Sequence, residues 1–335
     1  MYVADTIREI NESEWNTLVG DNIECSHAWF RVVEDSSTRK MRYVLVRENG
    51  NLSAAACSYV YKEKMYNLEI PFLQVKCPLG ISPGFFSTTP AETHILIREL
   101  EQIRRKEKAQ GLLFFDLNKE VFTLIKKSVK GFTDIFPLDN TYIDLNYSDF
   151  DDYLTSLDED AWRSARMTLN RARRWKIKTI FSDDFSAYKG TVIKLQECLC
   201  NHHNDFRMFM SEKFYEALEN NLKENSELVI FFKGEIPLAS ALILNTPDTV
   251  IYKAAGIDLE HRKYQAYFLL YYEAIRKALE RGQKRIYFGP TTYEFKERIG
   301  CKREELYGLV KIENPVLNAA LKTYLSISRL WGKKF

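Results

Sequence analysis

The stretch FGPTTYEFKERIG, residues 288–300, places hydroxyl, aromatic and cationic side chains directly after a strand-like run. Lys296 follows Phe295, and Tyr293 precedes them in the same segment. Loops that follow strands in this way are favoured sites for ligands, which a cation could contact. The alternative interpretation is that Lys296 and its charged neighbours form a solvated helix face.

The densest charge lies at residues 162–178, which hold seven Lys and Arg residues and no acid. Apolar residues recur there at helical spacing, so the segment predicts an amphipathic helix. Arg163, Arg166 and Arg174 can share one face with Asn170, and such a face would suit phosphate groups of a coenzyme, a carrier arm or a tRNA. The alternative is a helix that has cations near its C-terminus and pairs them with the preceding acids.

The stretch CLCNHHNDFRMFM holds a second group of chemically capable residues, His202 and His203, in a segment expected to link two helices. Histidine is a plausible base near neutral pH, although surface and capping histidines are common. Cys198 and Cys200 lie beside them and raise the alternative of zinc. No second ligand pair with suitable spacing follows, so no metal is expected.

Composition indicates an ordinary globular protein. The chain has 335 residues, a formal net charge of +2 and six cysteines, which suits two domains and a reducing, cytoplasmic compartment. No apolar run is long enough to span a membrane, and the N-terminus lacks a secretory apolar segment. The near-neutral charge does not favour DNA as a partner.

The elements that must position these residues repeat along the chain. Residues 42–61 and 227–245 both read as β-hairpins, each after a short helix. Residues 249–257, 266–282 and 284–289 predict a strand, a long helix and a strand, a β-α-β unit with parallel strands. A domain boundary is expected near residues 146–152, and the last helix is expected to pack on the second domain.

This order resembles the GNAT acyltransferase core, and two such halves in tandem resemble the FemAB-like branch. The strings that carry the resemblance are NESEWNTLVGDN, YLTSLDEDAWRSARMTLNRARRWKIKTI, LVIFFKGEIPLASALIL, IYKAAGID and GQKRIYFGPTTYEFKERIGC. The resemblance implies an α/β protein with two GNAT-like domains, each a mixed, mostly antiparallel twisted sheet flanked by helices. Residues 1–147 would be a degenerate domain on the acceptor side, and residues 148–335 would be the catalytic domain.

The resemblance also implies roles for individual residues. The Phe295–Lys296 pair would stabilise the transfer intermediate, with Tyr293 and His203 as further catalytic candidates. The donor would be bound through its phosphates by Arg262, Lys263, Tyr264, Arg163, Arg166 and Arg174. The acceptor would be bound by His202, Asp205, Arg207 and Tyr252.

The expected activity is N-acyl transfer, an EC 2.3 reaction, from acyl-CoA or a phosphopantetheine-carried acyl group to a small-molecule or peptide amine. One alternative is a Fem-type transferase that uses aminoacyl-tRNA and acts on a peptide or peptidoglycan precursor. Another is a noncatalytic binding module. Two departures bear on the choice: the donor loop EHRKYQAYF lacks glycine, and no long helical-hairpin insertion is present.

Overall fold

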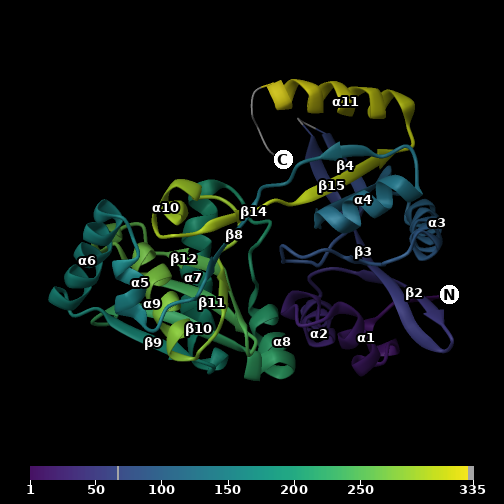
Figure 1. The fold of residues 1–335 in the computed structure, drawn as a ribbon. Helices are drawn as coiled ribbons and strands as arrows, with labels where there is room; N and C mark the ends of the chain where they lie inside the picture. Colours follow the sequence, from purple (N-terminus) through teal and green to yellow (C-terminus); the bar gives the residue numbers. More distant parts are fainter. Residues whose placement is uncertain (66–67, 331–335) are drawn as a thin grey trace. The chain divides into compact units, whose positions relative to one another are not determined.

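The computed structural model describes residues 1–65 and 68–330, and it divides into two compact units. Unit 1 comprises Met1–Asp139 together with Glu305–Phe335, and unit 2 comprises Asn140–Glu304. Each unit has its own mixed sheet with helices packed on it (Figure 1). The expected α/β class with two mixed, mostly antiparallel sheets is therefore confirmed.

In the described part of unit 1, the sheet runs β1-β2-β3-β4-β6-β15-β7, and β5 pairs with β3. Its strands are β1 (Tyr2–Ala4), β2 (Met41–Glu48), β3 (Asn51–Met65), β4 (Leu68–Val75), β5 (Phe85–Phe86), β6 (Gly111–Leu117), β7 (Thr133–Ile135) and β15 (Tyr307–Ile312). Its α-helices are α1 (Glu12–Val19), α2 (His27–Asp35), α3 (Pro90–Lys106), α4 (Lys119–Ser128) and α11 (Pro315–Leu330).

In unit 2, the sheet runs β14-β8-β13-β12-β11-β10-β9. Its strands are β8 (Asn140–Asp144), β9 (Lys178–Ser182), β10 (Ser226–Lys233), β11 (Ile236–Asn245), β12 (Thr249–Ile257), β13 (Arg285–Tyr287) and β14 (Lys302–Glu304). Its α-helices are α5 (Phe150–Thr155), α6 (Glu159–Arg174), α7 (Phe185–His203), α8 (Glu212–Leu222), α9 (Ala266–Glu280) and α10 (Tyr293–Arg298).

Both units repeat the same order of elements along the chain. Two helices are followed by a three-stranded antiparallel meander, then a helix, then a strand that pairs in parallel with the last strand of the meander. The parallel pairs are β4 with β6 and β12 with β13. The hairpin predicted at residues 42–61 turns at Asn49 and Gly50, which both have positive φ, as a tight two-residue turn requires. The predicted repeat is thus present as two similar supersecondary structures.

The two halves exchange strands, and this changes the expected boundaries. Strand β8 precedes most of unit 2 but pairs with β13 and β14, whereas β15 comes late in the chain and pairs with β6 and β7 of unit 1. The expectation that residues 140–147 close the first domain is therefore wrong. So is the continuous second domain to residue 335, because residues 305–335 belong to unit 1.

Helix α11 packs on unit 1 rather than on the second domain. Its Leu321 and Leu325 are buried in a cluster with Ile70 and Phe72 of β4 and Val310 of β15. The amphipathic pattern predicted the helix, but the side on which it packs follows from the position of β15, which directly precedes it. Among the described helices, none is both long enough and apolar enough to cross a membrane.

In unit 2, α7 and α9 cover opposite faces of the sheet. Ala241 and Ile243 of β11 share a buried cluster with Leu270 and Ile275 of α9. On the other face, a Cβ at Gly256 of β12 would approach the backbone of α7 to 2.6 Å, so only glycine allows this close contact. Helix α9 ends as predicted, with Gly282 at φ 70° just beyond its last turn.

Candidate active site

The parallel strands β12 and β13 separate soon after they pair. Only Thr249, Val250 and Ile251 of β12 find partners on β13, yet β12 continues to Ile257. Its pairing with β11 is interrupted by a bulge, and Ala254 adopts φ 49°, a left-handed conformation that is strained for a residue with a side chain. Bulges and strained residues concentrate near functional sites, and ligands favour the C-terminal ends of parallel strands.

The corner that follows β13 is also strained. Gly289, Thr291 and Thr292 all have positive φ, at 73°, 73° and 51°. A β-branched residue in this region is an outlier, and here two lie side by side. Such a backbone persists only when its surroundings hold it in place.

Lys296 of α10 holds this corner. Its Nζ donates hydrogen bonds to the carbonyl oxygens of Phe288 at 2.8 Å, Gly289 at 2.9 Å and Pro290 at 3.0 Å. The residue is 1% exposed, so the interpretation of Lys296 as part of a solvated helix face is wrong. Its neighbours Glu297 and Arg298 do face solvent, because the helix turns only one of its sides toward the corner.

Burial lowers the pKa of Lys296 to about 8, with the nearby Cys301 thiol acting in the opposite direction. The same burial raises the pKa of Cys301 to about 12, so this thiol stays protonated near neutral pH. The corner therefore holds a buried ammonium group close to its titration range and an unreactive thiol. This favours direct transfer between substrates over an acyl-cysteine intermediate.

An aromatic cluster connects the corner with β12 and α9. Phe295 lies 4.7 Å from Phe268 and 5.1 Å from Tyr271, measured between ring centroids. Tyr252 of β12 stacks on Tyr271 at 5.2 Å and contacts Phe288 at 5.5 Å. The structure thus brings together Phe295, Lys296 and Tyr252, which sequence reasoning assigned to two different roles.

The Tyr252 hydroxyl is buried and has no hydrogen-bond partner among the described residues. Burial raises its pKa well above the ordinary value, and so it remains a neutral group that can donate one hydrogen bond. A buried polar atom without a partner is unusual and calls for an explanation, such as a substrate or water. Tyr267 and Tyr271 lie beside it, with their hydroxyl oxygens 3.1 Å apart.

Tyr293 begins α10 and is half-buried. The Arg303 guanidinium lies 4.2 Å from the centre of its ring, a cation–π contact. Tyr293 therefore belongs to the same corner as Lys296, but it lies on the side that faces β14. The cation–π contact accounts for its ring orientation.

The donor-loop residues lie before α9. Arg262, Lys263 and Tyr264 form a short 3-10 helix, and Lys263 lies over the Tyr264 ring at 5.3 Å. Gln265 then adopts φ 55°, a conformation usually taken by glycine, and no side chain caps the start of α9. Gln265 thus takes the turn conformation for which glycine is usually required, and the loop has no glycine.

Helix α6 borders this loop. Arg171 donates a hydrogen bond to the Gln265 side chain at 2.7 Å, and Trp175 packs edge-on against Tyr264 at 5.2 Å. Arg163, Arg166 and Arg174 are all exposed on α6. Arg163 pairs with Glu159 and Asp160, in agreement with the alternative interpretation, whereas Arg166 stacks on Trp162 at 4.9 Å. Sequence reasoning missed Trp175 and Gln265, whose positions depend on packing between α6 and the loop.

The acceptor candidate His202 and the catalytic candidate His203 are in the last turn of α7, not in the following loop. Their rings are 4.9 Å apart and both are exposed. Asp205 and Arg207 form an exposed pair in the loop at 2.8 Å. The two histidines belong to α7, which covers the face of the sheet opposite α9.

A metal site at Cys198 and Cys200 finds no support in the geometry. In the part of the chain that the structure describes, the one group of three possible ligands within reach of a single ion is Asp258, Glu260 and His261. There, His261 Nδ1 lies 2.6 Å from Asp258 Oδ2, which fixes the imidazole at the start of the donor loop.

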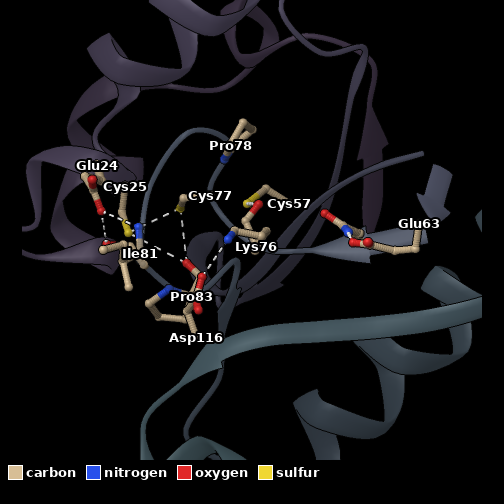
Figure 2. Close-up of polar contacts among 12 residues, drawn as sticks. Glu24, Cys25, Cys57, Glu63, Lys76, Cys77, Pro78, Ile81, Pro83 and Asp116 are labelled. Atoms are coloured by element: carbon tan, nitrogen blue, oxygen red, sulfur yellow. Dashed lines mark hydrogen bonds and ion pairs between the residues drawn. The ribbon is translucent and has the colours of Figure 1, made fainter. Parts of the chain in front are cut away.

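The equivalent corner of unit 1 is filled by the protein itself (Figure 2). Strands β4 and β6 stay paired to Val75 and Phe114, and directly beyond them Lys76 forms a buried ion pair with Asp116 at 2.7 Å. Gly84 lies so close to Lys76 that a Cβ would approach its backbone nitrogen to 2.5 Å. The end of this parallel pair is therefore closely packed.

The loop that follows β4 is fastened by polar side chains. Glu24 accepts hydrogen bonds from the Ile81 backbone N–H at 2.9 Å and the Ser82 hydroxyl at 2.8 Å. Cys77 Sγ lies 3.4 Å from Cys25 Sγ and 3.1 Å from the Pro83 carbonyl (Figure 2). The ends of the two parallel pairs therefore differ: an ion pair and a fastened loop follow β4 and β6, whereas a strained corner follows β12 and β13.

Comparisons with known proteins agree with this duplicated architecture. No curated protein matches the chain. The crystal structure of FemX superposes with a TM-score of 0.64 at 15% identity, covering 96% of this chain and 99% of that one. A tandem GNAT protein from the clavulanic acid biosynthesis pathway gives a TM-score of 0.59 at 9% identity, with coverages of 94% and 99%.

A third similar structure is the C-terminal domain of a putative lysylphosphatidylglycerol synthetase from Agrobacterium fabrum. Its TM-score is 0.60 at 13% identity, covering 95% of this chain and 96% of that one. At such identities the three structures establish the fold alone. The FemAB_like family model, described as peptidoglycan biosynthesis/recognition, matches residues 71–331. That match spans both parallel strand pairs and the exchanged strands β8 and β15, and the chain therefore belongs to the FemAB_like family.

Proposed function

We propose that the chain is an N-acyltransferase whose reaction takes place in unit 2, where β12 and β13 separate. The observation that carries the proposal is the buried Lys296 ammonium beneath a strained corner at the C-terminal end of β13. Membership of the FemAB_like family supports transfer of an acyl or aminoacyl group as the class of reaction.

In the proposed reaction, a neutral amine attacks the carbonyl carbon of a thioester. A C–N bond forms, the carbonyl electrons move to oxygen, and the tetrahedral intermediate then collapses with loss of the thiolate. The proton released by the amine nitrogen ends on the leaving sulfur, directly or through water. No group on the protein needs to become acylated, in keeping with the protonated state of Cys301.

Lys296 would stabilise the oxyanion by exchanging one of its three backbone acceptors. The bond to Pro290 is the longest at 3.0 Å and the only one of the three that is not fully buried. Replacing this neutral acceptor by an oxyanion would strengthen the interaction, because hydrogen bonds between charged partners are the stronger ones. The bonds to Phe288 and Gly289 would keep Nζ in position.

The other candidate residues are assigned to the reaction region, the donor or the acceptor according to where they lie. Phe295 and Tyr252 line the reaction region through the aromatic cluster, with the free Tyr252 hydroxyl available to a substrate. Arg262, Lys263 and Tyr264 would bind the phosphates of an acyl-CoA or a phosphopantetheine group. His202, Asp205 and Arg207 remain proposals for the acceptor, and His203 remains a proposal for catalysis.

A second candidate donor is aminoacyl-tRNA, which the family description, peptidoglycan biosynthesis/recognition, favours. The attack by the amine would be the same, with an ester in place of the thioester. A noncatalytic binding module is less well supported, since a binding surface alone does not require a buried cation beneath a strained corner.

The test is native mass spectrometry of the full chain with acyl-CoAs, acyl-carrier protein and aminoacyl-tRNA, followed by turnover with whichever donors bind. Lys296→Ala is expected to lower turnover more than tenfold, while the exposed Lys194→Ala on α7 is a matched control that changes it less than twofold. Binding of aminoacyl-tRNA alone would reject the thioester donor. Full turnover by Lys296→Ala would remove Lys296 from the mechanism.

A further inference from the structure

The charges of unit 2 are strongly segregated. Residues 140–304 hold 25 Lys and Arg residues and 25 Asp and Glu residues, and so their formal charges cancel. Within this neutral unit, residues 162–178 hold seven cations and no acid. The remainder of the unit is correspondingly acidic. A neutral domain with one strongly positive segment has a local binding surface rather than a general attraction for polyanions.

The cations of this segment are mostly available to a partner. The following five are exposed and form no ion pair among the described residues: Arg166, Arg173, Arg174, Lys176 and Lys178. Arg163 is the exception, because its partners Glu159 and Asp160 lie one turn before it. We call the exposed surface of residues 163–178 the basic face.

An apolar side chain lies in the middle of the basic face. Met167 is 52% exposed, with Arg163 four residues before it, Asn170 three residues after it and Arg174 seven residues after it. At helical spacing these residues surround Met167 on one side of α6. A flexible apolar anchor within a polar rim is typical of surfaces that bind proteins.

The C-terminal end of the basic face adjoins the donor loop. Arg171 bonds to Gln265 at 2.7 Å and Trp175 packs on Tyr264, so the two segments are joined by a hydrogen bond and a ring contact. Lys233 of β10 donates to the Trp175 carbonyl at 2.5 Å and adds another cation there. A partner seated on α6 would therefore reach the loop that precedes α9.

We propose that the basic face docks a small acidic carrier protein, which presents the acyl group on a phosphopantetheine arm at the donor loop. This inference rests on the proposed function, because it specifies the form in which the thioester arrives. Charge complementarity selects an acidic partner, and Met167 supplies the apolar contact at the centre of the interface. The carrier's arm, not the carrier itself, extends from the donor loop toward the C-terminal ends of β12 and β13.

The same features favour an acidic protein over RNA. Arg166 lies over the ring of Trp162 and Trp175 packs edge-on against Tyr264, so both rings already have partners within the protein that compete with base stacking. Asp158, Glu159 and Asp160 begin α6 and would repel a phosphate backbone that continued along the helix. A compact partner with one acidic helix meets only the basic end.

The experiment compares binding of purified holo acyl-carrier protein by the full-length protein and two charge-reversal variants, using calorimetry at low ionic strength. R166E/R174E is expected to weaken binding at least tenfold. K194E/K213E changes the net charge equally at exposed positions of α7 and α8 and is expected to bind within twofold of the wild type. Should R166E/R174E fold poorly by circular dichroism, M167E serves in its place with the same expectation.

Equal binding by all proteins would overturn the proposal. Tighter binding of a tRNA acceptor-stem RNA than of the carrier, lost in R166E/R174E, would overturn it in favour of RNA. Turnover of acyl-pantetheine by the wild-type protein is measured separately. If acyl-pantetheine is consumed but the carrier does not bind, the docking proposal fails alone. If the carrier binds but no thioester is consumed, the proposed function fails.

Discussion

Lys296 Nζ donates a hydrogen bond to the Phe288 carbonyl over 2.8 Å, which joins α10 to the end of β13. Phe288 in turn packs against Tyr252 and Tyr271, so the cation, the strained corner and the aromatic cluster form one connected structure. A substitution in any one of these three parts should therefore affect the other two. The first two predictions test this connection through pH and through removal of one hydroxyl.

The stability of the protein should depend on the titration of Lys296. The folded-state pKa is about 8, below the ordinary value of 10.5. The unfolded chain then binds more protons between these values, so this residue's contribution to stability rises as pH increases from 8 to 10.5. The difference in urea midpoint between wild type and Lys296→Met, measured from pH 7 to 10, should increase with pH. The Cys301 thiol interacts with Lys296, but measurements up to pH 10 stay below its folded-state pKa of about 12, so its titration adds little to the difference. A constant difference would contradict the prediction.

Tyr252→Phe should separate stability from activity. Removal of a buried hydroxyl without a partner is expected to leave stability unchanged or to raise it by about 1 kcal/mol, while kcat/KM falls because a substrate contact is lost. Tyr153→Phe is the matched control, because its hydroxyl donates to the Ile299 carbonyl at 2.9 Å and its loss should destabilise by about 1 kcal/mol. Thermal melts and steady-state kinetics check both; destabilisation by Tyr252→Phe would indicate that its hydroxyl has a structural partner.

Breaking the Lys76–Asp116 pair in unit 1 should be costly. Lys76→Met leaves the Asp116 charge buried and is expected to destabilise by about 3 kcal/mol. The double variant Lys76→Met/Asp116→Asn should recover part of that loss, which a double-mutant cycle measures by urea unfolding. Arg8–Asp35 at 2.7 Å is an exposed comparison pair, and Arg8→Met should change stability by less than 1 kcal/mol. If Lys76→Met and Arg8→Met lost the same stability, burial would not determine how strongly each ion pair stabilises the protein.

Asp144 should stabilise unit 2 above its pKa and lose that effect in acid. Hydrogen bonds from Lys302 and Arg285 hold its pKa below the ordinary value of 3.8. Its contribution is therefore present above pH 4 and disappears as pH falls through the lower, folded-state pKa. Asp144→Asn should reduce stability at pH 6 by about 1 kcal/mol, and the difference from wild type should shrink as the solution is acidified below pH 4. Asp248→Asn removes the more exposed pair with Lys284 and should have a smaller effect.

Leu309→Ala should loosen unit 1 although it lies late in the chain. Leu309 is fully buried on β15, between β6 and β7, and its truncation is expected to cost about 3 kcal/mol. Hydrogen exchange should quicken in β6 and β7 and stay unchanged in β11 and β12. Leu242→Ala, fully buried in unit 2, should give the reverse pattern. Faster exchange in β12 upon Leu309→Ala would contradict the division into units.

Several features could be predicted from the sequence because they depend on local chemistry. The turn at Asn49 and Gly50, the end of α9 before Gly282 and the parallel pairing of β12 with β13 all follow from turn residues and hydrophobic period. Phe295 and Lys296 were predicted as site residues because of the family resemblance. Neither source could show that Lys296 is buried, because its acceptors are backbone carbonyls whose direction depends on the strained corner.

The sequence by itself determined the elements of this protein, their duplication and the concentration of cations on α6, since each depends on residue type and spacing along one segment. Only the tertiary structure decided that β8 and β15 are exchanged, that a strained corner follows β13 whereas an ion pair closes the end of β4 and β6, and that the Tyr252 hydroxyl has no partner among the described residues. These features arise from pairing and packing between segments distant in the chain. Local propensity contains no information about which distant partner a strand end or a hydroxyl will meet.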